Sequence, residues 1–171
     1  MEHGMIQRTL TVCFDGPNAY VKVTGRATFG VGQTLREFVG RMYARHASRL
    51  LVDATDCESM DSTFIGVLTS AAMDGRTIGI SVEIANASER VIQQIAGLGI
   101  SEFFRFSQGS ETVAPEAALS MLSVTREGGA EVTARVMLEA HERLAAANPE
   151  NLGRFKDVIE GLRKEAVGSG G

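Results

Sequence analysis

The pattern of hydrophobic and polar positions predicts a chain of alternating strands and helices. Residues 9–14 (TLTVCF) and 19–25 (AYVKVTG) alternate apolar and polar side chains, which is the period of a strand. The turn-forming run DGPN separates them, so they predict an opening β-hairpin. The apolar run at 49–55 (RLLVDAT) predicts a buried central strand. Residues 77–85 (TIGISVEIA) and 102–106 (EFFRF) predict two more strands.

Between these strands the apolar residues change to helical spacing. Residues 34–47 and 111–122 are each predicted to be amphipathic helices, and residues 64–75 a helix closed by Gly75. Residues 86–99 predict a helix with Ser88 at the N-cap. The apolar side chains of the second of these four helices share one stripe: Phe64, Val67, Leu68, Ala71 and Ala72.

The resulting order, β-β-α-β-α-β-α-β-α, predicts an α/β fold. Strands that alternate with helices form a largely parallel sheet with right-handed crossovers. The opening hairpin adds an antiparallel pair, so we expect a mixed, mostly parallel β-sheet with an antiparallel edge and packed helices. This domain is predicted to span residues 5–123.

A helical hairpin is predicted after this domain. REGGA lies within a linker at residues 124–130, the extension covers residues 131–167, and GSGG lies in a flexible tail at 168–171. Asn148 and Pro149 are expected to start its second helix. We expect these helices to pack on their own domain, to form a homodimer, or to capture a partner. The two predicted apolar stripes are Val132, Val136, Met137, Ala140 and Leu144, then Leu152, Phe155, Val158, Ile159 and Leu162.

Composition narrows the classes of function. The chain has 171 residues, 44% hydrophobic and 22% charged, which suits one folded domain with an appendage. A net charge of −4, no Trp and 6% aromatic residues argue against a nucleic-acid partner. No signal peptide is visible, and the longest apolar run is too short to cross a bilayer, so we expect a cytoplasmic protein without a membrane partner. The two cysteines form no zinc pattern.

Four acidic residues follow the predicted central strand: Asp53, Asp56, Glu58 and Asp61. The carboxyl end of a parallel strand is where α/β folds place their sites, so a magnesium-dependent enzyme using Asp53, Asp56 and Asp61 is one hypothesis. The sequence lacks the further acidic pair and the lysine that a receiver domain needs. No histidine can be paired with Ser62, Thr63 or Cys57 as a base. We therefore expect no enzyme, no catalytic residue, and no cofactor or metal of its own.

The run Asp61-Ser62-Thr63 opens the second predicted helix. An Asp or Ser there accepts a hydrogen bond from the first free amides of the helix, which makes it a cap. A phosphate on Ser62 is compatible with that role, because it would lie at the positive end of the helix dipole. It would add nearly two negative charges to a surface that is already acidic.

The stretch RLLVDATDCESMDSTFIGVLTSA, followed by SERVIQQIAGLGISEFFRF, resembles a STAS domain. More narrowly, it is similar to the bacterial anti-sigma-factor antagonists, whose central strand leads into a D-S-[S/T]-G-x-G motif at the start of a helix. Residues 61–66 correspond to that motif. The resemblance covers residues 5–123 and implies a STAS fold.

The resemblance implies a non-enzymatic regulator of transcription that works by partner switching. Ser62, or alternatively Thr63, would be phosphorylated by an anti-sigma factor with a GHKL-type serine kinase fold, and ATP and magnesium would belong to that kinase. The unphosphorylated protein would bind the anti-sigma factor, the phosphorylated protein would release it, and a phosphatase would reset the switch. The implied partner-binding residues are Asp56, Met60, Asp61, Ser62, Thr63, Phe64, Ile65 and Gly66.

Phe64 departs from this motif, because it takes the place of the first glycine. Two placements of its ring are open: the protein core or an apolar anchor in the partner interface. The departure also motivates an alternative function, a STAS scaffold or small-ligand-sensing module that is not phosphorylated.

Overall fold

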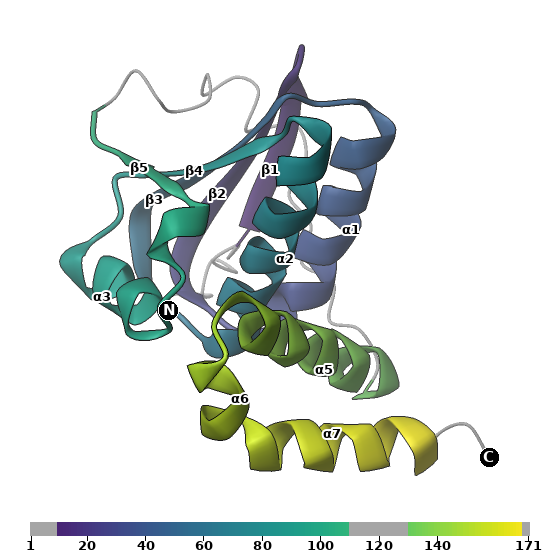
Figure 1. The fold of residues 1–171 in the computed structure, drawn as a ribbon. Helices are drawn as coiled ribbons and strands as arrows, with labels where there is room; N and C mark the ends of the chain where they lie inside the picture. The colour runs from purple at the N-terminus through teal and green to yellow at the C-terminus, as the bar shows by residue number, and fades with distance from the viewer. Residues whose placement is uncertain (1–9, 110–129, 169–171) are drawn as a thin grey trace, which may run out of the picture.

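The computed structural model describes residues 10–109 and 130–168, and within them one five-stranded sheet with the order β1-β2-β3-β4-β5 (Figure 1). Strand β1 pairs antiparallel with β2, and every later pair is parallel. The mixed sheet with an antiparallel edge is therefore confirmed. The strands are β1 (Leu10–Asp15), β2 (Asn18–Ala27), β3 (Arg49–Met60), β4 (Ser81–Ala85) and β5 (Arg105–Ser107).

Figure 1 shows α1 and α2 side by side along the sheet, with α3 apart from them. These helices follow β2, β3 and β4 in turn, as alternating parallel strands require. Short 3-10 turns precede α1 and β5. The bounds are η1 (Phe29–Val31), α1 (Gly32–Ala44), α2 (Ser62–Ile78), α3 (Glu89–Gly97) and η2 (Ser101–Phe103).

Two predicted boundaries near the site are wrong. Strand β3 does not end at residue 55 but continues to Met60, because residues 56–60 pair with β2 through two irregularities in the register. Helix α2 does not stop at Gly75. It ends at Gly79, whose φ of 81° gives the left-handed C-terminal cap that glycine favours. Ser88 caps α3 as predicted, accepting a hydrogen bond from the Val91 amide.

The C-terminal extension folds back onto the domain. It consists of α5 (Ala130–Ala147), α6 (Glu150–Arg154) and α7 (Lys156–Gly168). Helix α5 crosses the ends of α1 and α2, and α7 packs on α5 (Figure 1). Of the three placements left open by the sequence, the structure shows packing on its own domain. The predicted helix at 111–122 and most of the predicted linker lie outside the described residues.

The side chain of Asn151 connects this extension to the end of α3 by hydrogen bonds. Its side chain is fully buried, and its amide donates to the carbonyl oxygens of Leu98 and Leu144, both at 2.9 Å. The predicted second apolar stripe is partly wrong, because the predicted single helix is divided into α6 and α7 and only some of its residues are buried. Leu152 and Val158 are exposed, whereas Ile159 and Leu162 are buried.

We expect Asn151→Ala to lower the free energy of unfolding by about 1–3 kcal/mol, because a fully buried amide is removed and the Leu98 and Leu144 carbonyl oxygens keep only their hydrogen bonds to Asn148. Thermal or urea unfolding of the full chain measures this loss. Leu152→Ala is the matched control, since Leu152 is 58% exposed and its truncation should change stability by less than about 0.5 kcal/mol. Equal effects of the two substitutions would contradict the anchoring role of Asn151.

Candidate functional site

Asp61 links the end of β3 to the start of α2. One carboxylate oxygen accepts a hydrogen bond from the Phe64 amide at 2.8 Å, which caps the helix. The other accepts from the Phe29 amide at 2.7 Å and ties the turn after β2 to the same point. Burial raises the pKa of Asp61, while these backbone hydrogen bonds and the nearby His141 act to lower it. Asp61 therefore positions the residue that follows it.

Ser62 is the first residue of α2 and is half-buried. Its Oγ lies 2.9 Å from Nε2 of His141 on α5. The other ring nitrogen, Nδ1, lies 2.6 Å from the Met137 carbonyl oxygen, which can only accept. Nδ1 therefore carries the proton when the ring is neutral, and Ser62 donates its hydroxyl proton to Nε2.

The expectation that no histidine can be paired with Ser62 is wrong, since His141, separated from it by 79 positions, lies 2.9 Å from its hydroxyl. His141 is 3% exposed and packs edge-on against Phe155, with ring centroids 4.8 Å apart. The one signal in the sequence was its place next to Ala140 on the apolar stripe of α5. A histidine on a buried helix face needs polar partners, but periodicity does not say which residue supplies them.

Two glycines allow α5 to pack closely against the starts of α1 and α2. A Cβ atom on Gly66 would lie 2.5 Å from the Ala140 carbonyl oxygen, closer than side chains tolerate. A Cβ atom on Gly32, at the start of α1, would lie 3.2 Å from Cγ1 of Val136. Gly66, which corresponds to the second glycine of the family motif, thus gives room to a helix of the same chain.

Phe64 points into the core. Its side chain is 0% exposed, and it belongs to the main hydrophobic cluster. Of the two placements considered for its ring, the structure shows the core.

The structure places the other predicted partner-binding residues at three depths. Asp56 is exposed, and Asp61 and Ser62 are half-buried. The exposed Phe29 lies beside them, since its amide binds Asp61. The buried ones, some beneath α5 and others in the core, are Met60, Thr63, Phe64, Ile65 and Gly66. The partner contacts of these residues stay a prediction.

The four acidic residues of the metal hypothesis have other roles. Asp53 is buried and accepts hydrogen bonds from the amide and hydroxyl of Thr55. Asp56 pairs with Lys22 at 3.5 Å, and Glu58 pairs with Arg26 at 3.7 Å across the β2–β3 ladder. Among the described residues, no three His, Cys, Asp or Glu side chains lie close enough together to hold a metal ion.

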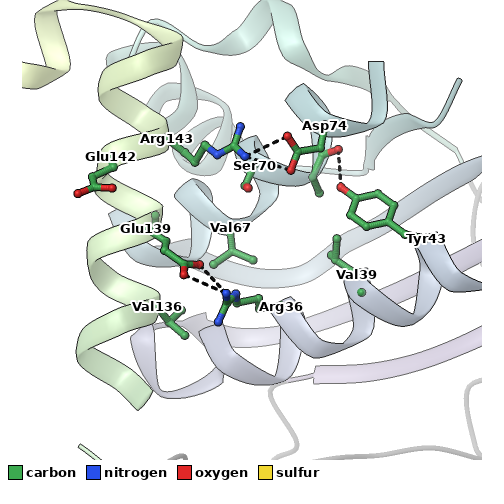
Figure 2. Close-up of a pocket in the computed structure, with 13 residues that line it drawn as sticks. Arg36, Val39, Tyr43, Val67, Ser70, Asp74, Val136, Glu139, Glu142 and Arg143 are labelled. Atoms are coloured by element: carbon green, nitrogen blue, oxygen red, sulfur yellow. Dashed lines mark hydrogen bonds and ion pairs between the residues drawn. The ribbon is translucent and has the colours of Figure 1, made fainter. Parts of the chain in front are cut away.

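A pocket of about 500 Å³ lies between α1, α2 and α5 (Figure 2). Its apolar part comes from valines such as Val39, Val67 and Val136. Two ion pairs cross it: Arg36–Glu139 at 2.8 Å and Arg143–Asp74 at 3.0 Å, and all four side chains are partly exposed. The contact between α5 and the domain is therefore tight at Gly66 and open, with charged groups, further along the helices.

The family model described as "Mlab, STAS domain" matches residues 10–105, which is more than half of the chain. The chain belongs to the STAS domain family. The matched segment holds the whole five-stranded sheet apart from the last two residues of β5, together with the Asp61–Gly66 segment. In this STAS protein, α5 to α7 lie beyond the matched segment.

Solved structures show the same fold at low sequence identity. The crystal structure of TM1081 from Thermotoga maritima, assigned as an anti-sigma factor antagonist, is 11% identical with a TM-score of 0.54. It covers 60% of this chain and 88% of its own. Unphosphorylated SpoIIAA, an anti-sigma factor antagonist, is 12% identical with a TM-score of 0.53 and covers 60% of this chain and 89% of its own. These similarities support the STAS fold of the domain.

No curated protein matches this chain. Among the described helices, none combines the length and the apolar character that a bilayer crossing demands.

Proposed function

We propose that this STAS protein is an anti-sigma-factor antagonist that binds an anti-sigma factor with serine kinase activity and is controlled by phosphorylation of Ser62. The observation that supports this most strongly is the place of Ser62. It is the first residue of α2, directly after the Asp61 cap and the long central strand of a STAS fold. TM1081 and SpoIIAA, which share this fold, are both described as anti-sigma factor antagonists, and this supports the same class of partner.

The covalent step is a phosphoryl transfer from ATP held by the kinase. Ser62 Oγ attacks the γ-phosphorus, the Oγ–P bond forms, and the bond from that phosphorus to the β,γ-bridging oxygen breaks. ADP leaves with the electron pair of that bond, and the hydroxyl proton passes to a base of the kinase. Hydrolysis by a phosphatase returns the hydroxyl and releases inorganic phosphate.

The surroundings of Ser62 explain how one phosphate changes binding while the domain stays folded. The free amides and the positive dipole end of α2 stabilise an anion at its first residue. The exposed carboxylates of Asp56 and Glu58 are paired with Lys22 and Arg26. A further charge of nearly −2 on Ser62 adds net negative charge to this surface, which repels an acidic partner surface, and it adds bulk to the interface.

Incubation with Mg-ATP and a GHKL-type anti-sigma kinase of the source organism, followed by phosphosite mapping, tests this function. We expect one phosphate on Ser62, its loss in Ser62→Ala, and normal phosphorylation of the control Ser59→Ala. Binding of Ser62→Asp to the same kinase should weaken by about 10-fold or more, because the added charge is uncompensated in the interface. Modification at neither Ser62 nor Thr63, together with unchanged binding of Ser62→Asp, would contradict the proposal.

The alternative, a scaffold or ligand-sensing STAS module without phosphorylation, is favoured by the pocket between α1, α2 and α5. That pocket combines an apolar part with the hydroxyl of Tyr43 and the two ion pairs (Figure 2). Absence of phosphorylation by the kinase, together with a small molecule retained in this pocket after purification, would support the alternative.

A further inference from the structure

We propose that α5 is an intramolecular competitor for the partner-binding surface. In the structure described above, which we call the closed form, α5 packs over Ser62 and Gly66. Both kinase binding and phosphorylation require α5 to separate from α2. This inference rests on the proposed function and adds to it the regulation of the same site.

The first argument is that α5 and the proposed partner use the same residues. Ser62 bonds to His141, and Gly66 lies against the backbone of Ala140. Near Gly32, Val136 fills the space beside Thr63. A second protein cannot reach the first turns of α2 while these contacts exist, because α5 already lies at contact distance from Gly66.

The second argument comes from the Ser62 hydroxyl. Its proton forms the hydrogen bond to Nε2 of His141, 2.9 Å away. Phosphorylation replaces that proton with a tetrahedral group, which does not fit into the 2.9 Å gap between Oγ and Nε2. The docked helix and the phosphate are therefore mutually exclusive, and a phosphate on Ser62 would keep α5 away.

The third argument is the character of the contact between α5 and the domain. Its centre is apolar and close, and its border carries the half-exposed ion pairs Arg36–Glu139 and Arg143–Asp74 (Figure 2). An apolar centre, a charged border and an incompletely filled pocket are features of interfaces that form and separate. The apolar centre consists of Val136, Ala140 and Leu144, which are buried and belong to the same hydrophobic cluster as Phe64 and Leu68.

A disulfide that holds α5 in place tests the inference. In Gly32→Cys/Val136→Cys, the valine carbon that crowds the Gly32 position is replaced by the reacting sulfur. The native Cys13 and Cys57 are buried, and burial raises the pKa of Cys57 to about 11, so thiolate exchange with them is slow near neutral pH. The single-cysteine variants and the native protein, each oxidised and reduced, are the controls.

We expect the oxidised double variant to be phosphorylated at Ser62, and to bind the kinase, at least about 10-fold less than the same protein after reduction. A helix-opening variant gives the opposite test. Ala140→Glu places a charged side chain against Gly66 and leaves the domain surface unchanged, so both readouts should rise about 10-fold or more over the native protein. Ala146→Glu, on the exposed side of the same helix, should match the native protein.

The outcomes separate this inference from the proposed function. Equal phosphorylation and binding of the oxidised, reduced and Ala140→Glu forms would overturn the competition and leave the proposed function standing. A disulfide-linked dimer in place of an internal disulfide would contradict the proposal that α5 covers the site of its own chain, because α5 would then come from a second copy. If no form is modified or bound, even when hydrogen exchange shows α5 of Ala140→Glu to be open, the proposed function and this inference both fall.

Discussion

Phe64→Ala is expected to lower the free energy of unfolding by about 3–5 kcal/mol, because it removes a fully buried ring from the core. For a chain of this length that loss corresponds to a fall in Tm of about 10 °C. Restoring the glycine of the motif with Phe64→Gly should destabilise the fold further, since glycine also costs about 1 kcal/mol inside a helix. Differential scanning calorimetry measures both changes.

Phe29→Ala is the matched control for this prediction. Phe29 is 51% exposed and lies on the turn that donates its amide to Asp61, so truncation of its ring should leave Tm nearly unchanged. The same substitution should weaken kinase binding if the exposed ring belongs to the partner interface. A Tm of Phe64→Ala close to that of the native protein would show that the ring is not the core residue described above.

Gly66→Ala should detach α5 while the STAS domain stays folded. The new methyl group would lie 2.5 Å from the Ala140 carbonyl oxygen, and crowding of this kind costs about 1–3 kcal/mol. Alanine is nevertheless the better residue for α2 itself by about 1 kcal/mol. We therefore expect the amides of residues 133–147 to lose about 10- to 100-fold in hydrogen-exchange protection, with little change in the strands.

Gly40→Ala supplies the contrast, because Gly40 is also inside a helix but has no atom within 4 Å of the position of the added carbon. It should stabilise the protein by about 0.5–1 kcal/mol and leave the protection of α5 unchanged. Similar exchange behaviour of the two alanine variants would mean that α5 does not rest on Gly66.

The fold could be predicted largely from the sequence because its signals are local. Alternating residues formed the hairpin, and helical spacing placed Val67 and Leu68 on the buried side of α2. The extension of β3 to Met60 could not be predicted, since the acidic run at 56–61 is unfavourable for a strand by itself. It becomes a strand by pairing with β2, from which Lys22 and Arg26 form ion pairs with Asp56 and Glu58.

Only the part of the candidate site at the start of α2 could be predicted from the sequence. Asp61 and Ser62 were recognised because a cap is a property of neighbouring residues. His141, which completes the surroundings of Ser62, comes from another helix, and no spacing rule connects positions so far apart in the chain. The sequence also left the placement of Phe64 open, because an apolar residue in the first turn of a helix can face the core or a partner.

The packing of α5 on α2 determines how high the concentration or the affinity of a partner must be for it to bind. Because both belong to one chain, α5 competes at an effective concentration that for short tethers is on the order of millimolar, whatever the abundance of the protein. A partner at micromolar concentration with the same intrinsic affinity for α2 would remain almost entirely unbound. The extension thus sets a threshold, and only a partner with a much higher intrinsic affinity, or one held nearby, would engage Ser62.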